Sequence, residues 1–149
     1  MTLSATSTPA FDWIDGGGVT TPLGFIAGGT YAGIKTYGDE PRMDLGILGG
    51  EAPLTAAGVF TRNAVTGHSV THGRRVLAQT RTVRGVIINS GNANTVTGTQ
   101  GAADCARMAA LAAGRLGGSD GDEVLVGSTG VIGRMLPMEK VERGVAEVT

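Results

Sequence analysis

The residues of this sequence best suited to chemistry are Ser128, Thr129 and Gly130, which follow a short run of branched aliphatic residues at 124–126. A hydroxyl and a neighbouring backbone N–H at the end of a strand can both point at one developing negative charge. Such a pair forms an oxyanion hole, which stabilises the tetrahedral intermediate of acyl transfer. The same residues could instead cradle a phosphate or form a tight structural turn.

The phosphate interpretation is the weaker functional one. Residues 127–133 contain no lysine, and a nucleotide-binding P-loop requires one. The segment also lacks, at the expected place, the acidic residue that holds a ribose in a dinucleotide fold. From composition alone, a structural turn is favoured over either functional role.

A second polar segment follows another predicted strand and holds three amides, Asn89, Asn92 and Asn94. Amides donate and accept hydrogen bonds without changing charge, so these residues are candidates for binding a polar substrate. The alternative is a cluster of Asx turns that caps the following helix. Two polar loops that each end a buried strand can meet at one edge of a sheet, which favours a shared site.

No metal site is predicted, because His68 and His72 have no cysteine or carboxylate at ligand spacing. They lie in a segment that we interpret as a polar connection. Cys105 lies on the apolar face of a predicted helix, which indicates inert core rather than a nucleophile.

The spacing of apolar residues predicts an α/β domain of layered sheet and helices. The continuous apolar character of 86–88 and 124–126 indicates a sheet covered on both faces. Residues 1–17 are predicted to be a flexible leader and 18–149 a single α/β unit. The predicted elements are a hairpin over 24–33, strands over 44–48, 56–61, 84–89 and 124–126, and helices over 99–116 and 138–148.

Composition narrows the classes of function. The 149 residues suit one domain and include 26 glycines, 17% charged residues and a formal net charge of −1. The near-neutral charge argues against nucleic-acid binding, and no apolar run could span a membrane. A single cysteine and an N-terminus without signal-peptide character predict a cytoplasmic protein. We expect the cations Lys35, Arg62 and Arg134 to be solvated, although Arg62 or Arg134 could hold a substrate carboxylate.

Four segments, in order along the chain, together resemble the ornithine acetyltransferase family, the bifunctional glutamate N-acetyltransferases of arginine biosynthesis. A single segment would be weak evidence, but four in register make the resemblance specific. The segments are Gly18-Val-Thr-Thr-Pro-Leu-Gly-Phe25, Ala57-Gly-Val-Phe-Thr-Arg-Asn63, Asn89-Ser-Gly-Asn-Ala-Asn-Thr-Val-Thr-Gly98 and Ser128-Thr-Gly-Val-Ile-Gly-Arg-Met-Leu-Pro-Met138.

The resemblance implies an αββα sandwich-like fold and transfer of acetyl from N-acetylornithine to glutamate, with acetyl-CoA as a further co-substrate in some members. No other cofactor is implied. A precursor of this family cuts itself before a threonine, which becomes the nucleophile of a β chain. The implied partner is therefore the β chain of the same precursor, in an αβ hetero-oligomer such as a heterotetramer. The oxyanion pair of the family falls on Thr129 and Gly130.

The family's Thr-Thr-Asp-Thr and Lys-Gly segments and its Ala-Thr-Met processing site do not occur among these 149 residues. We therefore expect the front part of an α chain, which supplies the oxyanion hole, lacks the threonine nucleophile and is inactive alone. Two other hypotheses remain. One is a non-catalytic α/β interaction domain with the same scaffold, and the other is a small-molecule or phosphate-binding module built on the glycine turn.

Overall fold

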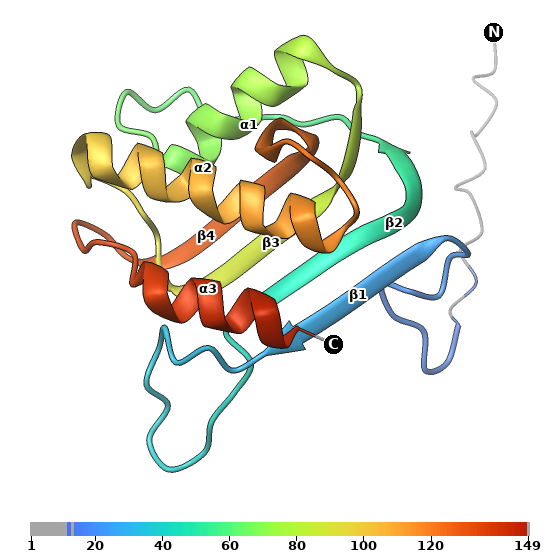
Figure 1. The fold of residues 1–149 in the computed structure, drawn as a ribbon, viewed down its shortest axis with the longest axis horizontal. Coiled ribbons are helices and arrows are strands. Elements are labelled where there is room, and N and C mark those ends of the chain that lie inside the picture. Colours follow the sequence, from blue (N-terminus) through green and yellow to red (C-terminus); the bar gives the residue numbers. More distant parts are fainter. Residues whose placement is uncertain (1–11, 13, 149) are drawn as a thin grey trace, which may run out of the picture.

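A sheet of four strands and three α-helices make up the part of the chain that the computed structural model describes, residue 12 and residues 14–148 (Figure 1). The leader predicted over residues 1–17 lies mostly outside these described residues. None of the described helices is both long and apolar enough to cross a membrane. In chain order the elements are β1 (Phe25–Thr30), β2 (Leu45–Thr55), α1 (His68–Gln79), β3 (Thr82–Asn92), α2 (Gly98–Arg115), the 3-10 helix η1 (Gly121–Glu123), β4 (Val124–Val131) and α3 (Met138–Glu147).

The strands lie in the order β1-β2-β3-β4, which is also their order along the chain. β2 is antiparallel to both β1 and β3, whereas β3 and β4 are parallel. A parallel pair needs a long crossover, and α2 supplies it here. The carboxyl ends of β3 and β4 therefore lie side by side, as expected for the two polar segments. The predicted α/β class is confirmed.

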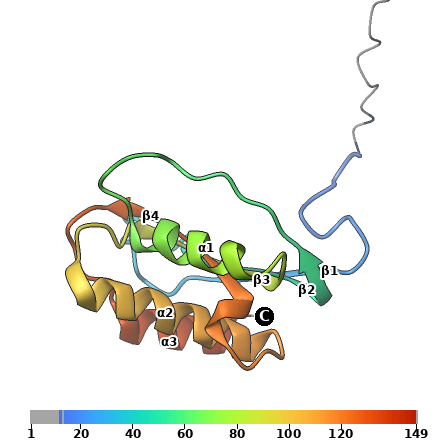
Figure 2. The ribbon, with the colours of Figure 1, turned by 90° about the horizontal axis from the view of Figure 1, so that it is seen from above.

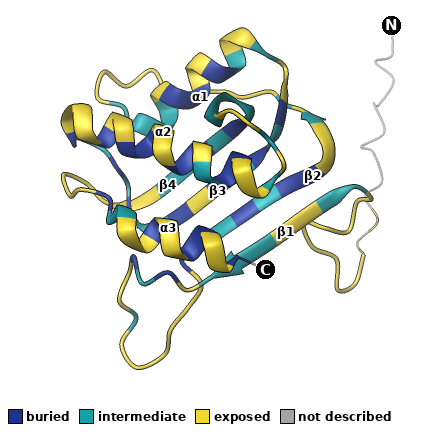
Figure 3. Ribbon diagram, in the orientation of Figure 1, coloured by how far each residue is buried: buried dark blue, intermediate teal, exposed yellow. Residues whose placement is uncertain are grey.

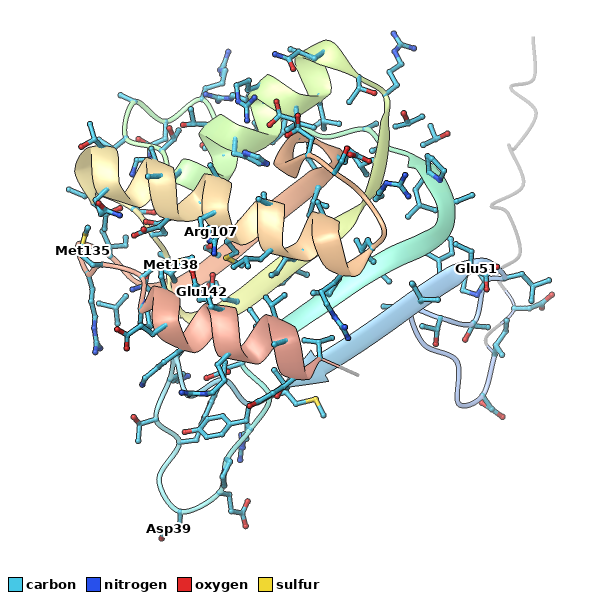
Figure 4. The ribbon with its side chains drawn as sticks, in the orientation of Figure 1. Asp39, Glu51, Arg107, Met135, Met138 and Glu142 are labelled. Atoms are coloured by element: carbon cyan, nitrogen blue, oxygen red, sulfur yellow. The ribbon has the colours of Figure 1, made fainter. Side chains whose placement is uncertain are left out.

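Helices α2 and α3 pack together on one face of the sheet (Figures 1 and 2). Their buried residues face the strands and their exposed residues face solvent (Figure 3). The contact side of α2 consists mostly of small residues, with Cys105, Met108, Ala109 and Ala112 all at most 2% exposed. Alanine at these positions lets the helix approach the sheet closely. Between the two helices, Arg107 and Glu142 point toward one another and form an ion pair at 3.1 Å (Figure 4).

Both helix predictions are confirmed to within one residue at each end, because α2 and α3 carry a regular apolar stripe. Helix α1 was not predicted, and the polar connection expected around His68 and His72 is wrong. The buried residues of α1 are His72, Gly73 and Val76. Only one of these three is aliphatic, so the sequence of α1 carries no regular apolar stripe. The buried face of α1 packs alongside β4, where His72 Nε2 lies 2.8 Å from the carbonyl oxygen of Val124.

The expectation of a sheet covered on both faces is wrong for the described residues. Ile87 of β3 faces α2 and α3 and is fully buried, whereas the next residue, Ile88, faces the other side and is 47% exposed. Side chains alternate between the faces of a strand, so Leu48 of β2 and Leu125 of β4 lie on the same open side and are only half-buried. No described helix covers this side (Figure 2).

Two predicted β elements are corrected. The hairpin predicted over 24–33 is a single strand, β1, over Phe25–Thr30, which pairs with β2 along its full length. Residues 56–61 are not a strand, although β2 extends to Thr55. The last link of that ladder is the bond from Ala56 N to Arg81 O at 2.8 Å. Beyond it the chain leaves the sheet, and Val59 is fully exposed.

The chain entering β4 is held by the carboxylate of Glu123, and this generates a prediction about acid stability. Glu123 accepts hydrogen bonds from the backbone N–H groups of Ser119 and Asp120, both at 3.0 Å, and from Arg84 Nε at 2.5 Å. These donors lower the pKa of Glu123 from 4.5 to about 2. The carboxylate therefore stabilises the fold fully above about pH 4.5, and this contribution is lost as the pH falls toward 2.

We expect Glu123→Gln to lower the melting temperature at pH 7 and to have a much smaller effect near pH 2. Glu51→Gln is the matched control, because the Glu51 carboxylate makes no hydrogen bond to the described residues. Glu51 lies within β2, where its N–H donates to the carbonyl of Gly24 beside the start of β1 (Figure 4). Thermal melts of both variants between pH 2 and 7 check the prediction. An equal deficit of Glu123→Gln at every pH would contradict it.

Candidate active site

The residues predicted to form an oxyanion hole lie within β4 rather than in a turn after it. The predicted strand at 124–126 continues to Val131, and Ser128, Thr129 and Gly130 pair in parallel register with Asn89, Ser90 and Gly91 of β3. The prediction of a turn over 127–133 is therefore wrong for its first half. The reason is that pairing with β3 extends the strand, whereas the low β-propensity of glycine and serine indicates a turn when their neighbours in space are unknown.

Gly130 has no room for a side chain. Its φ angle is +134°, and an added Cβ would lie 2.2 Å from the carbonyl carbon of Gly91 and 2.5 Å from the nitrogen of Asn92. Gly91 is similarly constrained, because its φ is +108° and its Cβ would lie 2.6 Å from Cβ of Lys35. Glycines at both positions bring the ends of β3 and β4, and the loop after β1, into direct backbone contact.

The pairing also determines where the N–H of Gly130 points. Consecutive peptide groups of a strand point to opposite edges. The carbonyl of Val131 accepts a bond from Ala93 N at 3.0 Å, on the β3 side. The carbonyl of Val124 faces His72 of α1, on the outer side. Gly130 is an even number of residues from Val124, so the backbone N–H and C=O groups of both residues point to the same edge of β4. The N–H of Gly130 therefore points to the outer edge of the sheet, away from β3.

The hydroxyl of Thr129 is close to this N–H and is not used by the fold. The side chain of Ser128 turns toward the covered face, where its Oγ is buried, so the side chain of Thr129 turns toward the open face. Thr129 is exposed, and its hydroxyl makes no hydrogen bond to the described residues. A hydroxyl and an adjacent N–H that are both unengaged can donate to one oxyanion.

A hollow of about 560 Å³ opens beside Thr129 and Gly130. It lies between the ends of β3 and β4, the loop after β1 and the start of α3. These backbone segments are at the lower left of Figure 1. Three cationic side chains border it: Lys35, Arg134 and Lys140. The sequence predicted Lys35 and Arg134 as solvated and did not single out Lys140. No local pattern brings these three together, since they come from segments far apart in the chain.

The three amide side chains are buried and engaged with the protein backbone. Asn89 Nδ2 donates to Asn92 O at 2.8 Å, and Asn94 Nδ2 donates to Gly101 O at 2.8 Å. Asn92 Nδ2 donates to two carbonyls of the β4–α3 connection, at 3.0 and 2.9 Å. All three residues are at most 2% exposed. These bonds fix the loops around the strand ends, but they do not cap the following helix α2, whose N-terminus has no side-chain cap bond. Substrate binding by the amides stays a prediction.

Two buried polar atoms lie directly behind the candidate oxyanion residues. Asn89 Oδ1 and Ser128 Oγ have no hydrogen-bond partner among the described residues, and the two residues occupy paired positions of β3 and β4. Both side chains face the covered side of the sheet. The strand ends that hold Thr129 and Gly130 therefore rest on a polar rather than a purely aliphatic layer.

Neither histidine nor cysteine forms a reactive centre in the described part of the chain. No cluster of three metal-ligating side chains occurs there, and the position of His72 against the Val124 carbonyl is structural. Burial raises the pKa of the Cys105 thiol to about 11, so the thiolate needed for nucleophilic attack is scarce at neutral pH. The predicted place of Cys105 in the core is confirmed, and its lack of reactivity stays a prediction.

Comparison with known proteins identifies the family. The profile of the ArgJ family matches residues 26–149. This chain belongs to the ArgJ family. It is 46% identical over 131 residues to the arginine biosynthesis bifunctional protein ArgJ of Gloeobacter violaceus, covering 88% of this chain and 31% of that protein. The Thermus thermophilus protein of the same name is 46% identical over 130 residues, covering 87% of this chain and 33% of that protein.

Solved structures of the family share the fold. A crystal structure of ArgJ from Bacillus halodurans matches with a TM-score of 0.82 and 34% identity, over 90% of this chain and 68% of that one. Ornithine acetyltransferase from Mycobacterium tuberculosis, solved in complex with ornithine, matches with a TM-score of 0.78 and 42% identity, over 89% of this chain and 71% of that one. The resemblance predicted from the four segments is confirmed. The chain spans about a third of the length of the curated relatives it matches.

The contact between Gly130 and Gly91 generates a prediction about stability. We expect Gly130→Ala to destabilise the fold by roughly 1–3 kcal/mol more than Gly133→Ala, the typical cost of overpacking. Gly133 is the matched control, since its φ is +77° and a Cβ there would meet nothing within 4 Å. Its alanine variant therefore bears only the backbone strain of about 1–2 kcal/mol. Urea unfolding measures both, and equal losses would contradict the close contact.

Proposed function

We propose that this chain is part of a glutamate N-acetyltransferase of arginine biosynthesis, which moves an acetyl group from N-acetylornithine to glutamate. Its contribution is the oxyanion hole formed by the Thr129 hydroxyl and the Gly130 N–H. The observation that carries the proposal is the outward N–H of Gly130 beside the unengaged hydroxyl of Thr129, in a chain of the ArgJ family. The names of the solved relative, an ornithine acetyltransferase, and of the bifunctional ArgJ proteins support it.

The proposed chemistry is acyl transfer through a covalent intermediate. A threonine hydroxyl attacks the acetyl carbonyl of N-acetylornithine and gives its proton to the threonine's own α-amine. The carbonyl oxygen becomes negatively charged, and the C–N bond breaks as the same proton passes to the leaving nitrogen, which releases ornithine. The neutral α-amine of glutamate then attacks the acetyl ester, its proton returns to the threonine oxygen, and N-acetylglutamate is released. Thr129 and Gly130 would donate to the same oxygen in both steps, when its charge is greatest.

The nucleophile in this proposal comes from a segment outside these 149 residues. The family's processing site, Ala-Thr-Met, is not among them, and the relatives are about three times as long. We propose that a self-processing precursor provides a β chain whose N-terminal threonine reaches the hollow beside Thr129. Use of acetyl-CoA as an additional acetyl donor is part of the same proposal.

The open face of the sheet supports a partner of this kind. Leu48, Val86, Ile88 and Leu125 give it an apolar surface without a covering helix among the described residues. A second sheet packed against it would complete a two-sheet sandwich and yield the αββα arrangement implied by the resemblance. We propose the β chain as that partner, in an αβ hetero-oligomer. A non-catalytic interaction domain would use the same face without the chemistry.

Thr129 tests the catalytic proposal. The chain is co-expressed with the remaining two thirds of the Thermus thermophilus relative, and acetyl transfer from N-acetylornithine to glutamate is measured. We expect Thr129→Val to lower the rate on the order of a hundred- to a thousandfold, the loss typical of one oxyanion donor. Thr129→Ser keeps the hydroxyl and should retain most of the activity. The chain by itself should show no turnover.

Two results would count against this assignment. If Thr129→Val is as active as the unsubstituted assembly, the hydroxyl is not an oxyanion donor. If the co-expressed assembly forms but transfers no acetyl group from either N-acetylornithine or acetyl-CoA, the interaction-domain alternative is favoured.

The open sheet face generates a prediction about association. We expect the isolated chain to self-associate, because an exposed apolar face and an uncovered β1 edge both promote it. Ile88→Lys, which places a charge on that face, should reduce self-association in light scattering, whereas Val59→Lys, in an exposed loop, should not. A monodisperse monomer that does not bind the complementary segment would contradict the prediction.

A further inference from the structure

The hollow beside Thr129 has a strongly biased charge. Its three charged side chains are Lys35 from the loop after β1, Arg134 from the β4–α3 connection and Lys140 from the first turn of α3, and its lining includes no acidic side chain. This bias is local, because the whole chain has a formal net charge of −1. Cations gathered in one concavity attract an anion and exclude a cation.

Lys35 is held at the hollow by its main chain. The buried carboxylate of Asp44 accepts the N–H of Ala32 at 2.8 Å and the N–H of Lys35 at 3.0 Å, which fixes the loop after β1. Because Gly91 has no side chain, this loop can lie directly against the end of β3. The ammonium group remains exposed, 4.7 Å from the centre of the Tyr37 ring.

Arg134 is held in a similar way from the opposite side. Its carbonyl accepts a hydrogen bond from Asn92 Nδ2 at 3.0 Å, whereas its guanidinium makes no hydrogen bond to any described residue. Lys140 donates from Nζ to the carbonyl of Gly33, which links α3 to the same loop. The main chains at Lys35 and Arg134 are thus anchored by buried Asp44 and Asn92, and their charged groups are left available.

We propose that this hollow binds a carboxylate of glutamate, with Lys35 and Arg134 as its specificity-determining contacts. The assignment rests on the proposed function, in which glutamate accepts the acetyl group beside Thr129. Glutamate carries two carboxylates and one ammonium, whereas ornithine carries one carboxylate and two ammonium groups. Three cations around one hollow therefore favour glutamate over ornithine. A guanidinium binds a carboxylate through two parallel hydrogen bonds, which makes Arg134 the stronger contact.

The test is a titration, followed by NMR, of the 149-residue chain labelled with ¹⁵N and assembled with the complementary segment of the Thermus thermophilus relative, because the isolated chain is expected to self-associate. L-glutamate, L-ornithine and inorganic phosphate are added separately. We expect glutamate to shift the amide signals of Lys35, Gly91 and Gly130, and ornithine to bind at least tenfold more weakly. Arg134→Gln and Lys35→Gln should each weaken glutamate binding by about tenfold, the effect of losing one charge-assisted hydrogen bond. Arg81→Gln, at an exposed arginine that does not border the hollow, is the matched control and should change nothing.

Several outcomes would overturn the assignment. They are the absence of glutamate-induced shifts at the hollow, unchanged affinity in both Arg134→Gln and Lys35→Gln, equal binding of ornithine, or phosphate binding as tight as that of glutamate. The last result would show a general anion site. Thr129→Val should leave glutamate binding intact, so failure of acetyl transfer and failure of glutamate binding are separate results.

Discussion

The parallel pairing of β3 with β4, closed by the backbone contact between Gly91 and Gly130, is the constraint on which the candidate site depends. A Cβ at Gly130 would lie 2.2 Å from the carbonyl carbon of Gly91, so the two strand ends meet only because both residues are glycine. Their register turns the N–H of Gly130 to the outer edge and the side chain of Thr129 to the open face. Two adjacent donors are thereby left unengaged without any strained loop to hold them.

Buried polar side chains hold the surroundings of these donors in place. Asp44 anchors the loop after β1 through two backbone N–H groups, and Asn92 anchors the β4–α3 connection through two carbonyls. Buried polar groups are costly unless they are bonded, so these bonds restrict each segment to one position. The consequence is a hollow whose walls come from segments distant in sequence, two of which are held in place by the buried side chains of Asp44 and Asn92.

The small-residue composition explains why this rigid site sits on an incompletely covered sheet. Alanines and glycines let α2 and α3 approach one face closely, and the core there is fully buried. The same composition leaves few large side chains to close the opposite face, where Ile88 is 47% exposed. A sheet with one fully buried face and one half-buried apolar face is suited to receive a second layer. The strand ends that carry Thr129 and Gly130 lie at the border between these two faces.

Several elements follow from local signals along the chain. The apolar periodicity of α2 and α3 and the branched aliphatic runs of β3 and β4 specify those segments. The adjacency of the Thr129 hydroxyl and the Gly130 N–H is also given by the sequence, because the two residues are neighbours in the chain. Other features depend on partners that are distant along the chain, and these emerge from the folded structure. It made Ser128–Gly130 a strand through pairing with β3, formed α1 from a segment with a largely polar buried face, and buried the amide of Asn92 against the backbone. The folded structure also brings Lys35, Arg134 and Lys140 to the border of one hollow. No spacing pattern in the sequence indicates this, because the three residues come from segments that are distant along the chain.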